Sequence, residues 1–290
     1  MINFTHFLGD LVDDQWHIDP KKFQPNMVIN GASEHYGNGM LEVLAQALTN
    51  DSTVYSHDPD DHLKLPNLKF YPYWYHWSKQ NWPQTHRENI AQDRKQYSVS
   101  CLNNSSHPHR IINWFALRDR KDILITMRND TKNNANNITL TEQEQEQWNI
   151  ERKKLEPRQQ FSQEGKRVDA DILHEAYTNS YVNLVTETVT CPKVFITEKT
   201  WKPIASGQLF MILGDPGTIE HLREQGIDCF DDIIDHNYDA IEDTRERIAE
   251  LHRSLDKLLK QDLYNINLLT KQRRTKNAEL FWSNKLYYEL

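Results

Sequence analysis

Segments with the composition of β-strands alternate with amphipathic helical segments along this chain of 290 residues. Residues 26–48 predict a short strand, a loop rich in Gly and polar residues, and a helix that places Leu41 and Leu44 on one face. Residues 97–127 repeat this order as strand, polar loop, helix and strand. Alternation of this kind is typical of proteins with parallel sheets, so we expect an α/β fold.

A polar connection at residues 78–95 separates two such series of elements. We therefore predict two domains, 1–92 and 93–290, as two Rossmann-like layers that face a cleft. Ligands of such sheets bind at the carboxyl ends of the strands, near the start of helices. The second domain is expected to carry an exposed polar insertion at 129–166 and a helical C-terminus from residue 239.

Four stretches predict particular elements. The insertion is expected to be partly helical at 141–155. The aromatic stretch 68–77 is rich in residue types that favour strands. The apolar residues 193–197 are expected to end a strand that runs into a helix, and residues 239–275 carry apolar side chains at helical spacing.

The balance of charge argues against nucleic acid as a partner. Asp and Glu number 42 and Lys and Arg 34, a net charge of −8, whereas a protein that binds duplex DNA usually offers a broad basic face. The basic run 271–276 still leaves a local basic groove open. The three cysteines, Cys101, Cys191 and Cys229, are too few and too scattered to predict a disulfide framework or a zinc site. No signal peptide or membrane-spanning window is recognised, so the cytoplasm is the expected location.

The segment 193–204, KVFITEKTWKPI, places an acid and two bases where an apolar stretch turns into a helix. A helix that begins near Thr197 directs free N–H groups and a partial positive charge towards a ligand, which favours phosphate. Lys199 adds a full charge that can reach a diphosphate, and the Glu198 carboxylate can accept hydrogen bonds from a sugar diol. The alternative is an ordinary helix start that Thr197 caps.

A second loop of this kind, residues 100–110, leaves a strand and enters a helix. Its Ser and Asn side chains and Arg110, whose planar fork of donors suits phosphate, predict another anion site. The alternative is a capped surface loop with a solvated arginine. Glu187 lies at the end of a predicted strand just before the 193–204 segment. It is expected either to fix Lys199 or Arg110, or to be solvated.

The loop 29–39 follows the first predicted strand and carries Glu34 and His35. A titratable group in a flexible Gly-rich loop is a usual setting for a general base, and the alternative is a solvated acid. The acidic residues between Asp58 and Asp61 have the spacing of a metal–nucleotide site, but such pairs are common in loops. We therefore expect no metal ligands.

Two segments together resemble the donor-binding signature of the α-1,3-fucosyltransferases. Residues 181–216 match its strand ending in Asn-Leu-x-x-Glu, its Thr-Glu-Lys motif, its helix and its apolar strand ending in Gly. Residues 97–110 are similar to the family's Val-Ser-Asn segment with its arginine. The matched region falls within residues 97–230, nearly half of the chain.

The resemblance implies two Rossmann-like domains in the GT-B arrangement and an inverting glycosyltransferase that needs no metal for its chemistry. It implies that Glu198, Lys199 and Arg110 contact a nucleotide sugar, with a GDP-sugar favoured and fucose or another hexose transferred. The tyrosine of the family's motif is Phe195 here, which lacks the hydroxyl that would bond the donor. The counterpart of the family's catalytic acid is Glu34, in Gly-Ala-Ser-Glu instead of Gly-Glu-Asn.

The expected reaction is transfer of the sugar to a hydroxyl of a glycan or a lipid-linked acceptor. Two alternatives remain open at the level of the sequence. One is a glycosyltransferase that acts on modified bases in DNA, for which the basic run 271–276 is the support. The other is a nucleotide- or glycan-binding module that has lost catalysis, for which Phe195 and the altered loop at Glu34 are the support.

Overall fold

The computed structural model describes residues 2–11, 19–33, 40–48, 51–58, 64–82, 94–129, 138–155, 175–188, 194–283 and 285–287. The chain divides into two compact units, Met1–His76 and Trp77–Leu290. Each unit is built around its own parallel sheet of four strands, so the predicted α/β class is confirmed.

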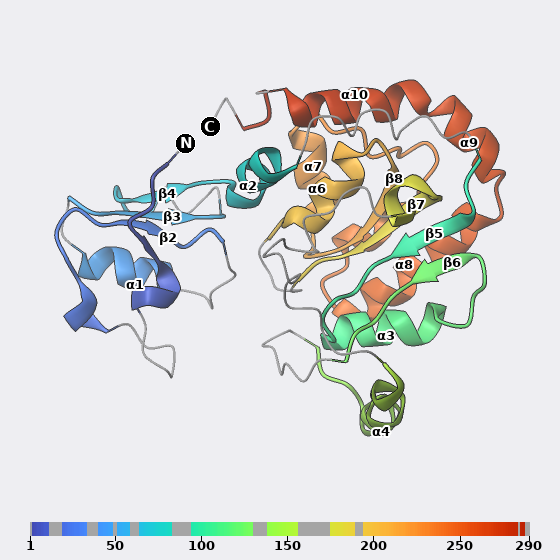
Figure 1. Cartoon of the computed structure of the whole chain (residues 1–290), viewed down its shortest axis with the longest axis horizontal. Helices are drawn as coiled ribbons and strands as arrows, with labels where there is room; N and C mark the ends of the chain where they lie inside the picture. The colour runs from blue at the N-terminus through green and yellow to red at the C-terminus, as the bar shows by residue number, and fades with distance from the viewer. Residues whose placement is uncertain are drawn as a thin grey trace. The chain divides into compact units, whose positions relative to one another are not determined.

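The first unit contains a sheet with its strands in the order β1-β2-β3-β4, all parallel. Its elements are β1 (His6–Phe7), β2 (Val28–Asn30), α1 (Met40–Ala47), β3 (Thr53–Ser56) and β4 (Leu68–Phe70), with 3₁₀ turns at Leu8–Leu11 and Pro20–Lys22. Helix α1 lies along one face of the sheet (Figure 1), where Leu41 and Leu44 pack against the buried Ile29, Val54 and Leu68. Removal of these side chains from water holds the unit together.

Helix α2 (Tyr73–Asn81) begins in the first unit and ends in the second. The expectation of strand structure over the whole stretch 68–77 is therefore wrong beyond β4. Within α2, the buried Tyr75 and Ser78 lie three positions apart, the spacing of one helical face. Burial of this face outweighs the strand preference of the aromatic side chains, because tertiary packing decides when propensities are weak.

The second unit contains a parallel sheet with the order β6-β5-β7-β8. Its strands are β5 (Tyr97–Cys101), β6 (Ile123–Ile125), β7 (Ser180–Thr186) and β8 (Leu209–Leu213). Every residue of β8 is buried, as expected for a strand that is covered on both faces. Strands β5, β7 and β8 lie where the sequence predicts them.

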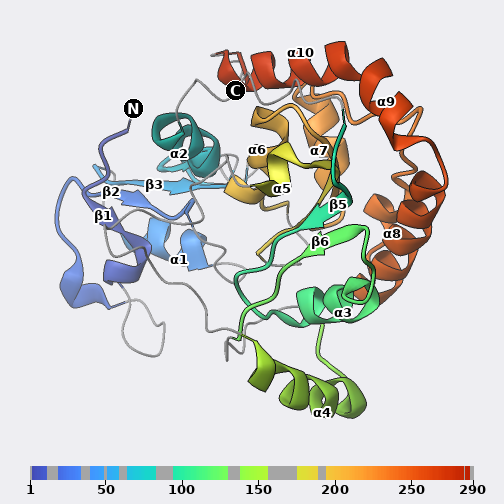
Figure 2. The ribbon, with the colours of Figure 1, turned by 45° about the vertical axis from the view of Figure 1, so that its right-hand side comes forward.

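Helices cover both faces of this second sheet (Figures 1 and 2). The described helices of this unit are α3 (Pro108–Leu117), α4 (Glu142–Glu151), α5 (Glu175–Thr178), α6 (Glu198–Ala205), α7 (Thr218–Glu224), α8 (Thr244–Leu259), α9 (Leu263–Leu269) and α10 (Lys271–Trp282), with 3₁₀ turns at Arg152–Lys154 and Asn237–Ala240. Of these, α4 packs on α3 through Trp148 and Trp114 and lies away from the sheet (Figure 1). α3 and α8 lie on one side, and α6 with α10 on the other. The helix predicted within the polar insertion is confirmed as α4, which begins with a capping box at Thr141.

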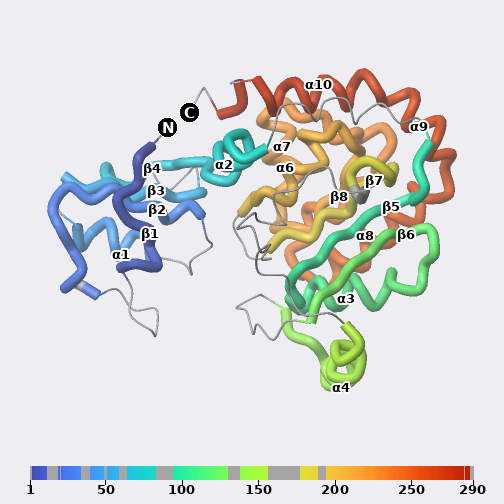
Figure 3. Tube along the Cα trace, viewed as in Figure 1, coloured from blue at the N-terminus to red at the C-terminus, as the bar shows by residue number. Residues whose placement is uncertain are grey.

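Two predicted elements take a different form. The helical segment from 239 to 275 is divided among α8, α9 and α10, which follow one another in Figure 3, because Asp262 accepts from the backbone of Asn265 and starts a new helix. The described part of 193–197 forms no strand. The N–H groups of Phe195 and Thr197 donate instead to the carboxylates of Asp215 and Glu187.

Candidate functional site

The order of strands in the second sheet indicates where a ligand would bind, before any side chain is considered. β5 pairs with β6 on one side and with β7 on the other, so the chain reverses its direction of winding between β5 and β7. At such a switch point the loops after the two strands diverge and leave a crevice at their carboxyl ends, where ligands of α/β sheets bind. The loop 102–107 follows β5, and Glu187 follows β7.

The Glu187 carboxylate is fully buried and accepts four hydrogen bonds. Oε1 accepts from the Thr197 N–H at 3.0 Å and from the Thr200 hydroxyl at 2.7 Å. Oε2 accepts from the Thr197 hydroxyl at 2.6 Å and from the Thr188 N–H at 3.2 Å. Glu187 thus joins the end of β7 to the first turn of α6. Of the two alternatives for this residue, the solvated acid is wrong.

The first turn of α3 holds the same end of β7 from the other side. Arg110 Nη2 donates to the carbonyl oxygens of Thr186 at 3.0 Å and Glu187 at 2.8 Å. His109 Nε2 lies 2.9 Å from the Glu187 carbonyl. Both side chains are buried, so the solvated arginine of the alternative interpretation is wrong. Arg110 is thereby placed at the switch point, bonded to the backbone that carries Glu187.

Helix α6 begins as the sequence predicts. Thr197 is the N-cap, and its hydroxyl accepts from the N–H of Lys199 at 3.4 Å. Glu198 and Lys199 follow in the first turn and form an ion pair of 2.9 Å. The Lys199 ammonium also donates to the hydroxyls of Thr188 at 3.0 Å and Thr197 at 3.2 Å. The three donors of this ammonium therefore meet three protein oxygens.

The side chains of this pair differ in exposure: 5% for Glu198 and 29% for Lys199. Burial alone would raise the pKa of Glu198, but the charges of Lys199 and Lys202 and the hydrogen bond from Lys199 lower it to about 2. Glu198 is therefore an anion at neutral pH and can only accept hydrogen bonds. Lys202 is itself buried in α6, so its charge acts at short range on this carboxylate.

The remaining predicted site residues lie in different places. Phe195 is buried two residues before the cap, and its N–H donates to Asp215 Oδ2 at 2.9 Å. Glu34 lies outside the described residues, as does His35. The strand before it ends at Asn30, and the N–H of Gly31 donates to the Tyr55 carbonyl at 2.9 Å. The structure therefore brings together Arg110, Glu187, Glu198 and Lys199, and Phe195 lies in the chain between Glu187 and Glu198.

Several polar residues of the site did not stand out in the sequence. His109 precedes Arg110, and Thr200 and Asp215 supply bonds that fix the start of α6 and the segment before it. The sequence could have indicated His109, because this residue lies in the first turn of a predicted helix that follows a strand. Thr200 and Asp215 have no such signal, because their partners are distant in sequence.

The two arginines of the basic run 271–276 make contacts within the protein. Arg274 is buried and donates to the carbonyls of Gly207 at 2.6 Å and Asn267 at 2.7 Å. Arg273 binds carboxylates of the turn between α7 and α8. Two of the four basic residues of the run are thus committed to internal contacts. Half of the positive charge in the run, which was the support for a DNA substrate, is therefore already paired within the protein.

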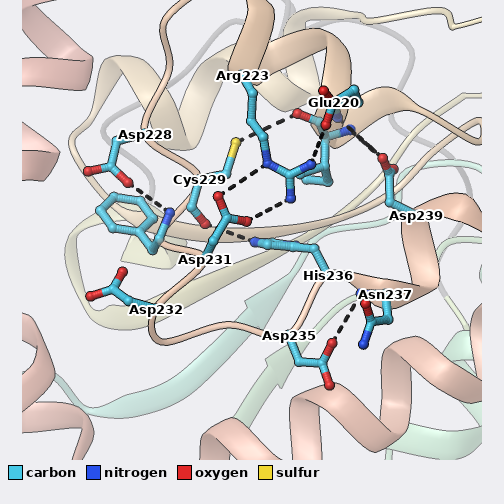
Figure 4. A network of polar contacts seen from close by, with 12 residues as sticks. Glu220, Arg223, Asp228, Cys229, Asp231, Asp232, Asp235, His236, Asn237 and Asp239 are labelled. Carbon is cyan, nitrogen blue, oxygen red and sulfur yellow. Dashed lines mark hydrogen bonds and ion pairs between the residues drawn. The ribbon is translucent and has the colours of Figure 1, made fainter.

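That turn, residues 228–239, forms a second network of carboxylates (Figure 4). Arg223 binds Asp231 with two hydrogen bonds, of 3.2 and 2.7 Å. Arg273 binds both Asp228 and Asp232. Arginine pairs lower the pKa of Asp228 and Asp232. Among the residues that the structure describes, no group of three or more His, Cys, Asp or Glu side chains is placed to hold a metal ion.

Comparisons with known proteins add little to this geometry. No protein-family model matches the chain, and no curated protein matches it. Among solved structures, the chain is similar to one described as "Crystal Structure of alpha1,3-Fucosyltransferase", with a TM-score of 0.40 and 11% sequence identity, over 92% of this chain and 82% of that chain. No helix in the described ranges is long and apolar enough to cross a membrane. Function is therefore inferred from the residues of the site.

Proposed function

We propose that the second unit binds a nucleotide sugar at the switch point and that the chain is a glycosyltransferase. The observation that carries the proposal is the pair at the start of α6: a buried, ionised Glu198 beside Lys199, held by Glu187 at the carboxyl edge of a parallel sheet. The motif resemblance to the α-1,3-fucosyltransferases supports the same residues in the same roles.

The two members of the pair suit two parts of one ligand. A bare phosphate would gain from Lys199 and the helix start but would be repelled by Glu198. A ligand that carries hydroxyls next to its phosphates can satisfy both, because the carboxylate accepts from the hydroxyls while the ammonium binds the phosphates. Lys199 can exchange Thr188 for a phosphate oxygen and keep its other bonds. Ribose and hexose diphosphates have this chemistry, and the motif favours a GDP-sugar.

The proposed reaction is an inverting displacement. An acceptor hydroxyl attacks the anomeric carbon from the face opposite the nucleotide, and its proton passes to a carboxylate, for which Glu34 is the candidate. The bond between the anomeric carbon and the diphosphate oxygen breaks, and its electron pair leaves with the diphosphate. Lys199, Arg110 and the start of α6 stabilise the negative charge that develops there, so the chemistry requires no metal. The acceptor is a glycan or a lipid-linked sugar.

Two alternatives compete with this proposal. A DNA-base glycosyltransferase would use the same donor site but needs a basic surface for phosphates, and Arg273 and Arg274 are bound internally. A binding module without catalysis would keep the donor site and lack transfer. Phe195 is buried and has no hydroxyl, so it cannot form the hydrogen bond to the donor that is expected of the tyrosine in the family's motif. This difference favours the binding module.

Thermal unfolding in the presence of a panel of nucleotides and nucleotide sugars tests the donor site. A ligand that binds the folded chain raises the melting temperature by an amount that grows with its concentration over Kd. We expect GDP and a GDP-sugar to raise it more than GMP and inorganic phosphate do. A melting temperature that no nucleotide changes at millimolar concentration contradicts the proposal.

Incubation of the stabilising nucleotide sugar with and without acceptors then separates the functions. Release of nucleotide, by hydrolysis or transfer, supports an enzyme, whereas binding without release supports the module. Transfer to a glycan acceptor and not to duplex DNA supports the proposed reaction over the DNA alternative.

A further inference from the structure

Helix α6 is buried at every residue except Lys199. Its other basic residue, Lys202, is 6% exposed, although an ammonium group is seldom buried unless an anion lies close to it. Glu198 is also buried and lies four positions earlier, so the two side chains share one face of the helix, one turn apart. The first turns of α6 therefore hold a buried anion and a buried cation on the same face.

Two positive charges act on this anion. Burial by itself raises the pKa of Glu198, and the charges of Lys199 and Lys202 oppose that effect strongly enough to bring the value to about 2. Lys199 also donates a hydrogen bond to Glu198 Oε1 at 2.9 Å. Lys202 therefore shares with Lys199 the compensation of one buried carboxylate.

Lys199 is the member of this group that a ligand can reach. Its side chain is 29% exposed, and its two further partners are the hydroxyls of Thr188 and Thr197, which carry no charge. A phosphate that binds this ammonium competes with the Glu198 carboxylate for the same positive charge. A buried carboxylate is destabilised when its compensating charge is withdrawn, so Lys199 binds an outside anion more easily if a second cation stays with Glu198.

We propose that Lys202 is a positioning residue of the donor site: it compensates the Glu198 carboxylate from within α6 and thereby leaves the Lys199 ammonium available to the phosphates of the nucleotide sugar. Because its own side chain is buried, Lys202 acts through Glu198 and not by contact with the ligand. This role rests on the proposed function and gives the two lysines of α6 different tasks in it.

Removal of the Lys202 charge tests this role. Lys202→Met keeps most of the length and volume of the side chain but carries no charge, so Lys199 alone must compensate Glu198. We expect calorimetric titration to show GDP affinity about tenfold weaker than that of the unmodified chain. Lys202→Arg retains the charge and should restore most of the affinity. Lys276→Met, at an exposed position, is the matched control and should leave the affinity unchanged.

A second background shows whether the effect passes through Glu198. Glu198→Gln removes the charge of the carboxylate and keeps a side chain of similar size. In this background Lys202→Met should change GDP affinity by less than about twofold, because the anion on which Lys202 acts is gone. A role of Lys202 in the fold alone, or a direct attraction of its charge for the phosphates, predicts the same loss in both backgrounds. That result overturns the inference.

Melting temperatures establish that each variant is folded before it is titrated. If Lys202→Met does not fold, Glu198→Gln and the double variant Glu198→Gln/Lys202→Met decide between the outcomes. Equal GDP affinity of these two proteins supports the inference, and weaker binding by the double variant overturns it. Unchanged GDP affinity in a folded Lys202→Met also overturns the inference but leaves the proposed function standing. Absence of any nucleotide binding to the unmodified chain overturns both.

Discussion

The two sheets of this protein share their strand number and their parallel direction but differ in strand order. In the first unit the strands follow one another from β1 to β4 across the sheet. In the second unit β5 lies between β6 and β7, so the winding reverses there. The reversal separates the loops after β5 and β7, and it is between these loops that Arg110 and Glu187 meet. Parallel strands alone do not create this site; the order of the strands does.

The two sheets also differ in the hydrogen bonds at the carboxyl ends of their strands. In the first unit the described residues after β2 make separate hydrogen bonds. Asn30 accepts from the Ala32 N–H, Gly31 donates to the Tyr55 carbonyl of β3, and the Ser33 carbonyl accepts from the Trp74 indole N–H. In the second unit one buried carboxylate, Glu187, joins a strand end to a helix start. The first edge is held by separate hydrogen bonds and the second by four bonds to a single buried carboxylate, so substitutions in the two should have different consequences.

The largest effect is expected at Glu187. Glu187→Ala removes four hydrogen bonds from a buried site and leaves the N–H groups of Thr188 and Thr197 without an acceptor. We expect the free energy of unfolding to fall by about 4 kcal/mol and nucleotide binding to be lost. Urea unfolding measures the first effect and titration with GDP the second. The exposed Glu279→Ala is the control, and equal stability of the two variants would contradict the role given to Glu187.

Acid should weaken the second unit through its buried histidines. Burial lowers the pKa of His109, His221, His236 and His252 below the ordinary value of 6.5. Below pH 6.5 the unfolded chain takes up protons that the folded chain does not, so stability present at neutral pH is lost as the pH falls. With a folded pKa of about 3, His109 alone accounts for about 2 kcal/mol lost between pH 6.5 and pH 5. Urea midpoints at both pH values should differ less for His109→Gln, and the same difference in both proteins would refute this assignment.

The turn of the first unit can be tested at Gly31. A Cβ at this position would lie 2.8 Å from the Tyr55 carbonyl oxygen and 2.5 Å from Leu41, closer than packing allows. Gly31→Ala should therefore cost about 2 kcal/mol of stability. GDP affinity should remain, because the donor site belongs to the second unit. Gly9→Ala, with no atom within 4 Å of the new Cβ, is the matched control. Loss of GDP binding in Gly31→Ala would contradict the assignment of the donor site to the second unit.

The smallest effect is expected in the surface network of residues 228–239. Arg273→Ala removes pairs with Asp228 and Asp232 and the cation–π contact with Phe230, all at a partly exposed side chain. Exposed pairs contribute little, so we expect a loss of about 1 kcal/mol and unchanged affinity for GDP. Calorimetric melting checks the first and titration the second. A loss as large as that of Glu187→Ala would remove the distinction between the surface network and the site.

The parts of the site that lie within one stretch of the chain could be predicted from the sequence. Thr197, Glu198 and Lys199 lie within one turn, so the cap follows from the motif, whereas the ion pair between Glu198 and Lys199 was not predicted. The helical form of 73–81 differs from the expectation because packing outweighs propensity there, whereas the start of α9 depends on the cap at Asp262, which the apolar periodicity of 239–275 does not reveal.

The hydrogen bonds that hold the elements of the site together join residues far apart in the chain. His109 meets Glu187 across 78 positions, and Phe195 meets Asp215 across 20. Nothing in the local pattern specifies these partners. They follow from the strand order, which depends on how the whole second sheet is assembled.

The central claim is that Lys199 binds the diphosphate of a nucleotide sugar. Calorimetric titration of GDP into the unmodified chain, Lys199→Ala and the exposed control Lys276→Ala tests it most directly. Since loss of one hydrogen-bond donor that stabilises developing negative charge costs roughly 2.7–4 kcal/mol of transition-state stabilisation, turnover of Lys199→Ala should also fall about a hundredfold or more. The prediction is clear binding by the unmodified chain and by Lys276→Ala, and affinity at least about tenfold weaker for Lys199→Ala with its fold intact. Equal affinity in all three proteins would contradict the claim.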